Sequence, residues 1–208
     1  MATPENFWDK TAAGYAKSAI RDTRAYEKKL AITQALFPPD AEVMEIACGT
    51  GTTALRHAPH VGHYLATDVS SRMLEIAREK AEAAGVLNVT FQQDDIGKAD
   101  WPAGHYDTVL AMSILHLLPD RTDALAKVHR TLKPGGVFVS STICLGEMAF
   151  YFPLLIGAMK LVGKAPNTVD SLTHEALSAA IMEAGFVIDE HHRMSKETVA
   201  FIVARKPA

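Results

Sequence analysis

The sequence contains few of the features that mark secreted, metal-binding or membrane-spanning proteins. It has only two cysteines in 208 residues, Cys48 and Cys144, which lie far apart and form no CxxC pair. This usage argues against a disulfide framework and a zinc knuckle, and it predicts a cytoplasmic, reducing location. No run of 18 residues is free of charge and apolar throughout, so we expect no transmembrane segment. The first residues also lack the basic start and apolar run of a signal peptide.

An excess of basic charge is also missing. The formal net charge is −3, and no basic cluster stands out, so nucleic acid is not an expected partner. His57, His60 and His63 recur at every third position, but Pro59 and Gly62 interrupt any helix that would bring their side chains together. We therefore expect no metal site.

The most informative stretch is residues 43–54, which read VMEIACGTGTTA. It begins as an apolar strand containing Glu45, turns at Gly49 and Gly51, and continues as a helix. A second apolar run ends at Asp68, which lies 17 residues beyond Gly51. A strand, a glycine turn, a helix and a strand that ends in a carboxylate predict a nucleotide-binding half-fold. The glycine pattern also fits a nicotinamide site, so the turn by itself leaves that alternative open.

Strand and helix signals alternate along most of the chain. Two helices are expected within residues 5–37, the second over 23–36. Strands are expected at 41–47, 62–68, 89–93, 106–111 and 137–143, with helices between them. After these come a helix over 173–185 and an antiparallel strand pair, 186–190 and 198–204. This order predicts an α/β fold, a doubly wound Rossmann-like sheet that is mostly parallel and has helices on both faces.

Residues 1–208 read as a single domain with four parts. The predicted parts are an N-terminal helical cap, a cofactor-binding core, an apolar lid or insertion, and a C-terminal helix and hairpin, at 1–40, 41–145, 146–172 and 173–208.

Several of these motifs together resemble the class I S-adenosylmethionine-dependent methyltransferases. The motifs are the glycine turn at 45–51, the acids Asp68 and Asp94 after two strands, and the pairs at 106–107 and 115–116. A Lys-Pro-Gly-Gly turn at 133–136 completes the set. The chain looks like the small-molecule branch that includes quinone C-methyltransferases and bacterial phospholipid N-methyltransferases. The resemblance implies a seven-stranded sheet whose last strand is inserted antiparallel, and S-adenosyl-L-methionine as cofactor, with S-adenosyl-L-homocysteine as product.

The resemblance also implies which residues hold this cofactor. Glu45 falls near its ammonium, Asp68 on its ribose and Asp94 on its adenine amino group. The full set of implied contacts is Tyr15, Glu45, Ala47, Cys48, Gly49, Gly51, Asp68, Val69, Met73, Asp94, Asp95, Ile96, Ala111 and Met112. Two residues depart from the family pattern. Ala47 stands where many relatives have glycine, and Asp95 stands where a small residue is common.

Charge supports the same cofactor. A pyrophosphate beside Glu45 and Asp68 would lack compensation, because no Lys or Arg follows the turn until Arg56. A sulfonium with an ammonium tolerates these acids better. The expected reaction is direct displacement of the methyl group by a nucleophile on a small, apolar phenol, quinone, amine or lipid headgroup. His116 is the candidate catalytic base, and the alternative is that it only packs within its turn.

The segment 148–159 is almost wholly apolar and is followed by Lys160 and Lys164. It could form a lid over a lipophilic substrate, a membrane-surface contact over 148–164, or a buried helix or interface. Two other functions remain open at this point, an NAD(P)-dependent oxidoreductase and a non-catalytic cofactor-binding protein. The sequence does not indicate the oligomeric state.

Overall fold

A computed structural model of the chain describes residues 3–148, 157 and 169–208. Its centre is a sheet of seven strands in the order β3-β2-β1-β4-β5-β7-β6. The strands are β1 (Glu42–Ile46), β2 (His63–Asp68), β3 (Val89–Gln93), β4 (Tyr106–Met112), β5 (Leu132–Ile143), β6 (Val187–Met194) and β7 (Val199–Arg205). The pairs among β1 to β5 are parallel, whereas β7 runs antiparallel to both β5 and β6. The expected sheet with an inserted antiparallel last strand is therefore confirmed.

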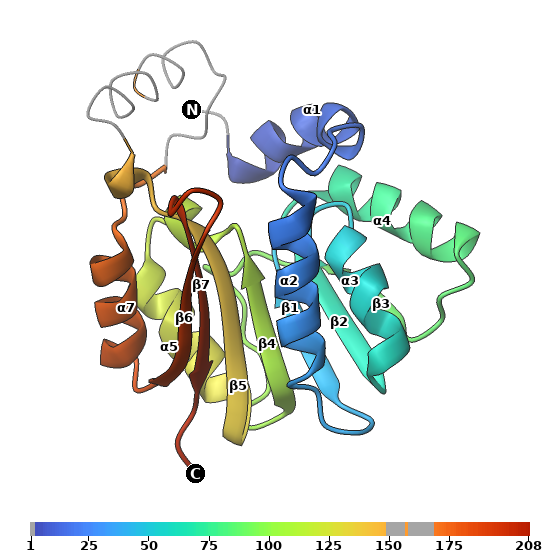
Figure 1. Cartoon of the computed structure of the whole chain (residues 1–208). Coiled ribbons are helices and arrows are strands. Elements are labelled where there is room, and N and C mark those ends of the chain that lie inside the picture. Colours follow the sequence, from blue (N-terminus) through green and yellow to red (C-terminus); the bar gives the residue numbers. More distant parts are fainter. Residues whose placement is uncertain (1–2, 149–156, 158–168) are drawn as a thin grey trace.

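Helices cover both faces of this sheet (Figure 1). The described helices of more than three residues are α1 (Pro4–Ala16), α2 (Thr23–Gln34), α3 (Thr52–His57), α4 (Ser71–Ala83), α5 (Arg121–Thr131) and α7 (His174–Glu183). One apolar cluster joins α3 and α4 to the sheet through Ala54 and Leu74, with Ile32 of α2 packed against it. The other joins α5 and α7 through Leu125 and Leu177. The predicted doubly wound α/β fold is confirmed.

Two strands are longer than the sequence pattern suggested. Strand β5 begins at Leu132, which pairs with Tyr106, while the next pair is Val137 with Thr108. The Lys-Pro-Gly-Gly turn is thus an irregularity inside the strand and does not precede it. Strand β6 extends to Met194 because it pairs with β7 along its whole length. Pairing with a neighbour, rather than local composition, decided both boundaries.

The amino ends of the central strands are tied together by Asp107. Its carboxylate accepts hydrogen bonds from the Glu42 backbone N–H at 2.9 Å and from Lys133 Nζ at 2.8 Å. It therefore connects β1, β4 and the turn of β5 at the edge of the sheet opposite to the glycine turn. This is a structural role for an acid that the sequence singled out as part of a family motif.

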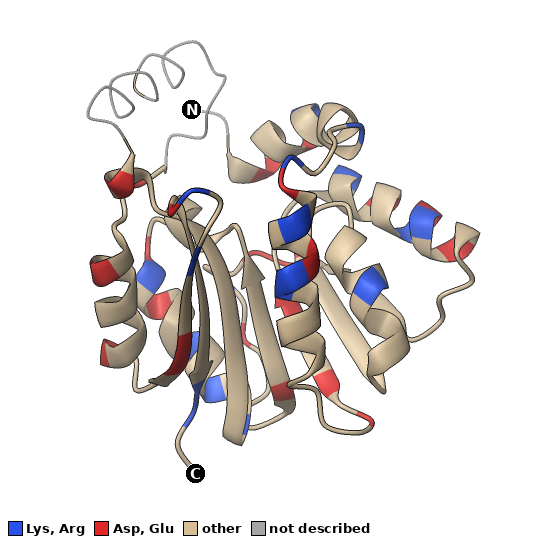
Figure 2. Ribbon diagram, in the orientation of Figure 1, with Lys and Arg blue, Asp and Glu red and all other residues tan. Residues whose placement is uncertain are grey.

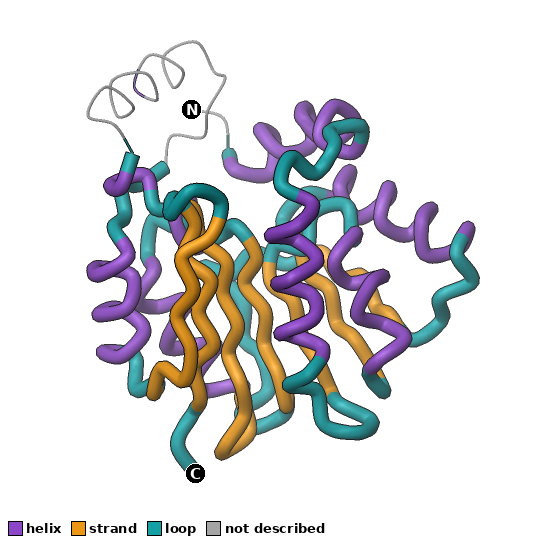
Figure 3. Tube along the Cα trace, in the orientation of Figure 1, coloured by secondary structure: helices purple, strands orange, loops and turns teal. Residues whose placement is uncertain are grey.

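Helix α1 and the loops that follow β1, β2 and β4 lie at the carboxyl edge of the strands (Figure 3). In the view of Figure 2, charges of both signs are interspersed on the surrounding helices. No described helix is long and apolar enough to cross a membrane. In the described parts of the chain, no three His, Cys, Asp or Glu side chains gather as a metal site.

The apolar segment 148–159 lies outside the described residues, except for Met148 and Gly157. The same holds for Lys160 and Lys164. The lid, membrane-contact and interface interpretations of 148–164 therefore stay predictions, as does the division of the chain into four parts.

Candidate cofactor site

The turn after β1 is built from left-handed backbone. Ala47, Gly49 and Gly51 have φ angles of 54°, 56° and 71°. The Cys48 N–H donates to the Thr67 carbonyl at 2.9 Å, which ties the turn to β2. At Gly51 an added Cβ would lie 2.8 Å from Ala77 Cβ, so this position has no room for a side chain. The two glycines thus allow a sharp turn packed closely on α4.

Asp68, the last residue of β2, holds the neighbouring loops in place. Its Oδ2 accepts from the Gly49 N–H at 2.8 Å, and its Oδ1 accepts from the Ser70 N–H at 2.9 Å. Burial raises the pKa of this carboxyl, and the two backbone donors oppose that shift. Each oxygen has a further lone pair, so the carboxylate can also accept from a ligand hydroxyl.

Asp94 follows β3 directly and lies beside Asp68, because its N–H donates to the Asp68 carbonyl at 3.0 Å. Its Oδ2 accepts from Trp101 Nε1 at 2.8 Å. The structure therefore places the two predicted acids at the ends of two adjacent strands, β2 and β3.

Glu45 lies below the turn and is almost completely buried. Its side chain accepts a hydrogen bond from the Tyr64 hydroxyl at 2.9 Å. Burial, with a smaller contribution from the charge of Asp68, raises the pKa of Glu45 to about 8. A buried carboxyl of this kind favours a cationic ligand group, which would stabilise its charged form.

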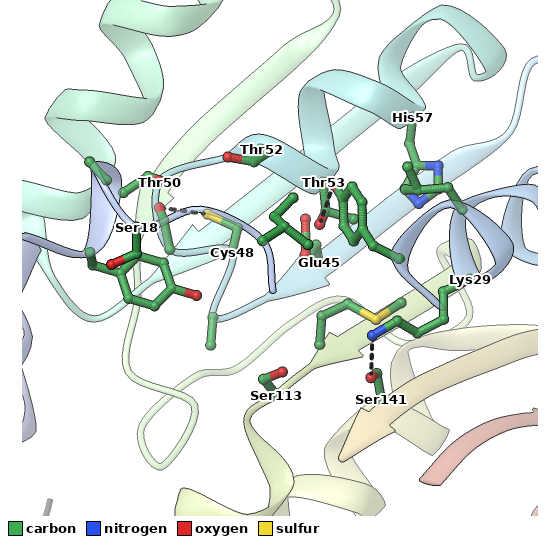
Figure 4. Close-up of a pocket in the computed structure, with 18 of the residues that line it drawn as sticks. Ser18, Lys29, Glu45, Cys48, Thr50, Thr52, Thr53, His57, Ser113 and Ser141 are labelled. Carbon is green, nitrogen blue, oxygen red and sulfur yellow. Dashed lines mark hydrogen bonds between the residues drawn. The ribbon is translucent and has the colours of Figure 1, made fainter. Parts of the chain in front are cut away.

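A cavity of about 330 Å³ opens between α1, α2 and the turn (Figure 4). Six residues from the predicted set line it, namely Tyr15, Glu45, Ala47, Cys48, Gly49 and Met112. The sequence analysis missed other polar residues of its wall, chiefly Tyr26, Lys29, Thr33, Thr53, His57, Ser113 and Ser141. Those on α2 carried no motif, and only the folding of α2 against the sheet brings them to the turn.

The remaining predicted contacts do not line this cavity. They are Gly51, Asp68, Val69, Met73, Asp94, Asp95, Ile96 and Ala111. Met73 is buried in α4, and its N–H donates to Ser70 Oγ, the helix cap. Asp95 has a local role, since its Oδ1 accepts from the Gly97 N–H at 3.0 Å. The roles of all these residues toward a ligand stay predictions.

His116 lies in a short 3₁₀ turn, Leu115–Leu117, just beyond β4, and its side chain is buried. Burial, aided by the charge of Arg121, lowers the pKa of His116 to about 4, so the imidazole is neutral near pH 7. Among the described residues, its Nδ1 has no hydrogen-bond partner. His116 does not line the cavity. A role in catalysis therefore requires that the methyl-accepting substrate binds beyond the end of β4, next to His116.

Helix α1 closes the site from above. Asp9 accepts hydrogen bonds from Ser70 Oγ at 2.6 Å and from the Arg72 N–H at 3.2 Å. These contacts fasten α1 to the start of α4, and Tyr15 then stands over Gly49, where an added Cβ would be 3.7 Å from its ring. The family resemblance implied Tyr15 as a cofactor contact, but no sequence signal indicated how α1 is attached.

The donor set fits S-adenosylmethionine better than a dinucleotide. The cavity wall contains a buried acid, Glu45, and one amine among its described residues, Lys29. Asp68 and Asp94 stand at the ends of the neighbouring strands β2 and β3, where their carboxylates can accept from hydroxyl and amino groups. A pyrophosphate would meet carboxylates at this point, whereas a zwitterionic amino acid joined to adenosine meets groups of matching polarity.

Comparison with known proteins agrees with this chemistry. A family model described as a methyltransferase domain matches residues 43–136. Among curated proteins, the ubiquinone/menaquinone biosynthesis C-methyltransferase UbiE of Ectopseudomonas mendocina is 30% identical over 200 residues, covering 86% of this chain and 78% of the relative. That likeness extends well beyond the glycine turn, into the C-terminal part of the chain.

Two solved structures share the fold. The cyclase SpnF has a TM-score of 0.74 and 20% identity, covering 89% of this chain and 83% of that protein. Phosphoethanolamine N-methyltransferase 2 of Haemonchus contortus, solved with S-adenosyl-L-methionine, has a TM-score of 0.72 and 18% identity, covering 88% of this chain and 53% of that protein. No comparison supports the nicotinamide alternative. The chain belongs to the family of S-adenosylmethionine-dependent methyltransferases that includes the ubiquinone/menaquinone C-methyltransferases.

Proposed function

We propose that this enzyme methylates a ring carbon of a small, largely apolar phenol or quinol. The observation that carries the proposal is the 30% identity with a quinone C-methyltransferase over 86% of the chain. In this proposal the bound cofactor supplies an electrophilic methyl group. A ring carbon of the acceptor would take that methyl group, with S-adenosylhomocysteine as the leaving group. The ring carbon would then lose its proton while the acceptor oxygen regains one, so that one proton is released overall.

The chain's own residues would bind and orient the two reactants. Asp68 and Asp94 would accept from the ribose hydroxyls and the adenine amino group, with Val69, Met73 and Ile96 against the ring. Glu45 would face the ammonium. Ala111 and Met112 would lie beneath the reacting carbon, so most of the rate enhancement would come from alignment.

His116 would act on the acceptor hydroxyl. Its imidazole is neutral at physiological pH and its Nδ1 is unpartnered among the described residues, so it can accept the phenol proton as the ring becomes nucleophilic. A cytoplasmic location belongs to the same proposal, and the two described thiols, both buried and free, fit a reducing compartment.

The test is an assay of the purified enzyme with S-adenosylmethionine and a panel of phenols, quinols, amines and phospholipid headgroups. Mass spectrometry would detect products heavier by one methylene, and NMR would locate the new methyl on carbon, oxygen or nitrogen. We expect a C-methylated phenol or quinol. Methylation of amines alone would overturn the proposed acceptor class while leaving the family assignment intact.

The role of His116 is tested with His116→Asn. A lost general base should lower kcat by about 100-fold or more while affinity for S-adenosylhomocysteine is retained. His60→Asn, at an exposed histidine, is the matched control. Equal kcat values for the two variants would contradict the assignment.

A further inference from the structure

Lys29 is an amine in the cavity wall without a carboxylate beside it. It comes from α2, and its Nζ donates to Ser141 Oγ on β5 at 3.1 Å (Figure 4). The acid that acts on it electrostatically is Asp22, the N-cap residue of its own helix. No ion pair of Lys29 occurs among the residues that the structure describes. This ammonium is half-buried, and its one hydrogen bond among the described residues goes to a hydroxyl, so an anionic ligand group in the cavity would find an uncompensated charge there.

Contacts of α2 with the rest of the fold hold Lys29 in position. The Thr33 hydroxyl donates to the Lys29 carbonyl at 2.8 Å. The start of α2 is anchored by Asp22, which accepts from the Ala25 N–H at 3.0 Å and from Ser195 Oγ, in the β6–β7 turn, at 2.9 Å. The start of α2 is thus connected to the turn between β6 and β7, and Lys29 is held toward β5.

The polar groups of the site follow the order of the strands. Asp94 stands at the end of β3, Asp68 at the end of β2 and Glu45 within β1, while Lys29 reaches β5 through Ser141. A ligand whose adenosine lies at β3 and β2 would extend its other end over β1 toward β4 and β5. The cavity at that end carries Glu45 and Lys29 on its wall. One acid and one separate amine form the complement of a zwitterion.

We propose that Lys29, positioned by Ser141, binds the α-carboxylate of the methionyl end of the cofactor, opposite Glu45. The inference rests on the adenosine placement of the proposed function, since that placement directs the amino-acid end toward Lys29. It does not depend on which acceptor the enzyme methylates.

The experiment is calorimetric titration with two ligands that share adenosine. S-Adenosylhomocysteine has the amino-acid carboxylate, and 5′-methylthioadenosine lacks the whole amino-acid group. Lys29→Met should weaken S-adenosylhomocysteine binding by about 10- to 100-fold, the effect of one charge-assisted contact, and leave methylthioadenosine affinity unchanged. Lys29→Arg keeps the charge and should recover much of the loss. Lys28→Met, on the exposed side of the same helix, is the control and should match the wild type.

Two outcomes would overturn the inference. An equal loss for both ligands would mean that Lys29 only supports the fold of the site. Unchanged affinity for both, with a raised KM for the acceptor, would assign Lys29 to the acceptor instead. If the wild-type protein bound neither ligand, the cofactor placement itself would fail, which is a separate result.

Discussion

Glu45 is a buried acid whose pKa the fold shifts strongly. Its pKa is raised from 4.5 to about 8 in the fold, so between these values the folded state keeps a proton that the unfolded state has lost. Stability therefore falls as pH rises through this window. Between pH 7 and 8 the slope should average about 1 kcal/mol per pH unit, because its limit of about 1.4 kcal/mol is reached only well below the folded-state pKa and halves at that pKa. The buried His57 and His116, whose pKa values are lowered to about 4, are neutral there in both states.

Urea unfolding at pH 7 and pH 8 measures this slope. Glu45→Gln keeps the size and an acceptor for the Tyr64 hydroxyl but cannot ionise, so the decline should largely disappear. Glu82→Gln, at an exposed helix position, should behave like the wild type. A Glu45→Gln variant with an undiminished slope would show that another group is responsible.

Ala47 has a backbone conformation that suits glycine, with φ of 54°. The family resemblance implies glycine at this position in many relatives, which suits this φ, and the methyl group of alanine carries some strain here. Ala47→Val should destabilise the protein by about 1–3 kcal/mol and weaken S-adenosylhomocysteine binding, because a β-branched residue is strained at this φ. Ala47→Gly should change stability by less than about 1 kcal/mol. Thermal unfolding and calorimetric titration with S-adenosylhomocysteine would compare the two variants. Equal stabilities of Ala47→Val and Ala47→Gly would contradict the prediction.

At the scale of elements, the attachment of α1 determines whether the site is covered. This helix is fastened to α4 by Asp9, and Gln93 of β3 also donates to Glu5 at 3.1 Å. Asp9→Ala removes the acceptor for Ser70 Oγ and the Arg72 N–H. We expect a modest loss of global stability, about 1–2 kcal/mol, because one half-buried side chain and its two hydrogen bonds are lost.

The larger effect should be local. Amide hydrogen exchange in α1 should become faster, and affinity for S-adenosylhomocysteine should fall several-fold, because the helix would order itself again on binding. Asp100→Ala, which breaks the exposed pair with Arg130, removes a carboxylate elsewhere and should alter neither readout. Unchanged exchange in α1 after Asp9→Ala would mean that other contacts hold the helix.

For the whole molecule, ligand binding and folding stability are linked. A ligand that binds only the folded state at 100 times its Kd adds about 2.7 kcal/mol. For a chain of 208 residues this corresponds to a rise in Tm of roughly 5–10 °C. Differential scanning fluorimetry with S-adenosylhomocysteine should show this rise, and NADH at the same excess should show none. A shift with NADH alone would contradict the cofactor assignment.

Local patterns were enough to predict the sheet, its helices and the glycine turn. The residues 43–54 and the acids Asp68 and Asp94 are close in sequence to the strands that position them, so strand geometry alone places them at one edge. The helix caps at Ser70, Asp120 and Thr173 are equally local, because each side chain accepts from a backbone N–H three residues further on. Such features depend on a few neighbouring residues, which is why a single sequence reveals them.

The other features required distant segments to meet. The irregular start of β5 and the full length of β6 come from pairing with strands elsewhere in the chain. Lys29 reaches Ser141 across 112 positions, and Ser195 reaches Asp22 across 173. No periodicity or motif marks such contacts, because their free energy comes from packing between elements. The sequence therefore indicated the cofactor's chemistry, and the folded chain was needed to bring Lys29 into the wall of the cavity that Glu45 also lines.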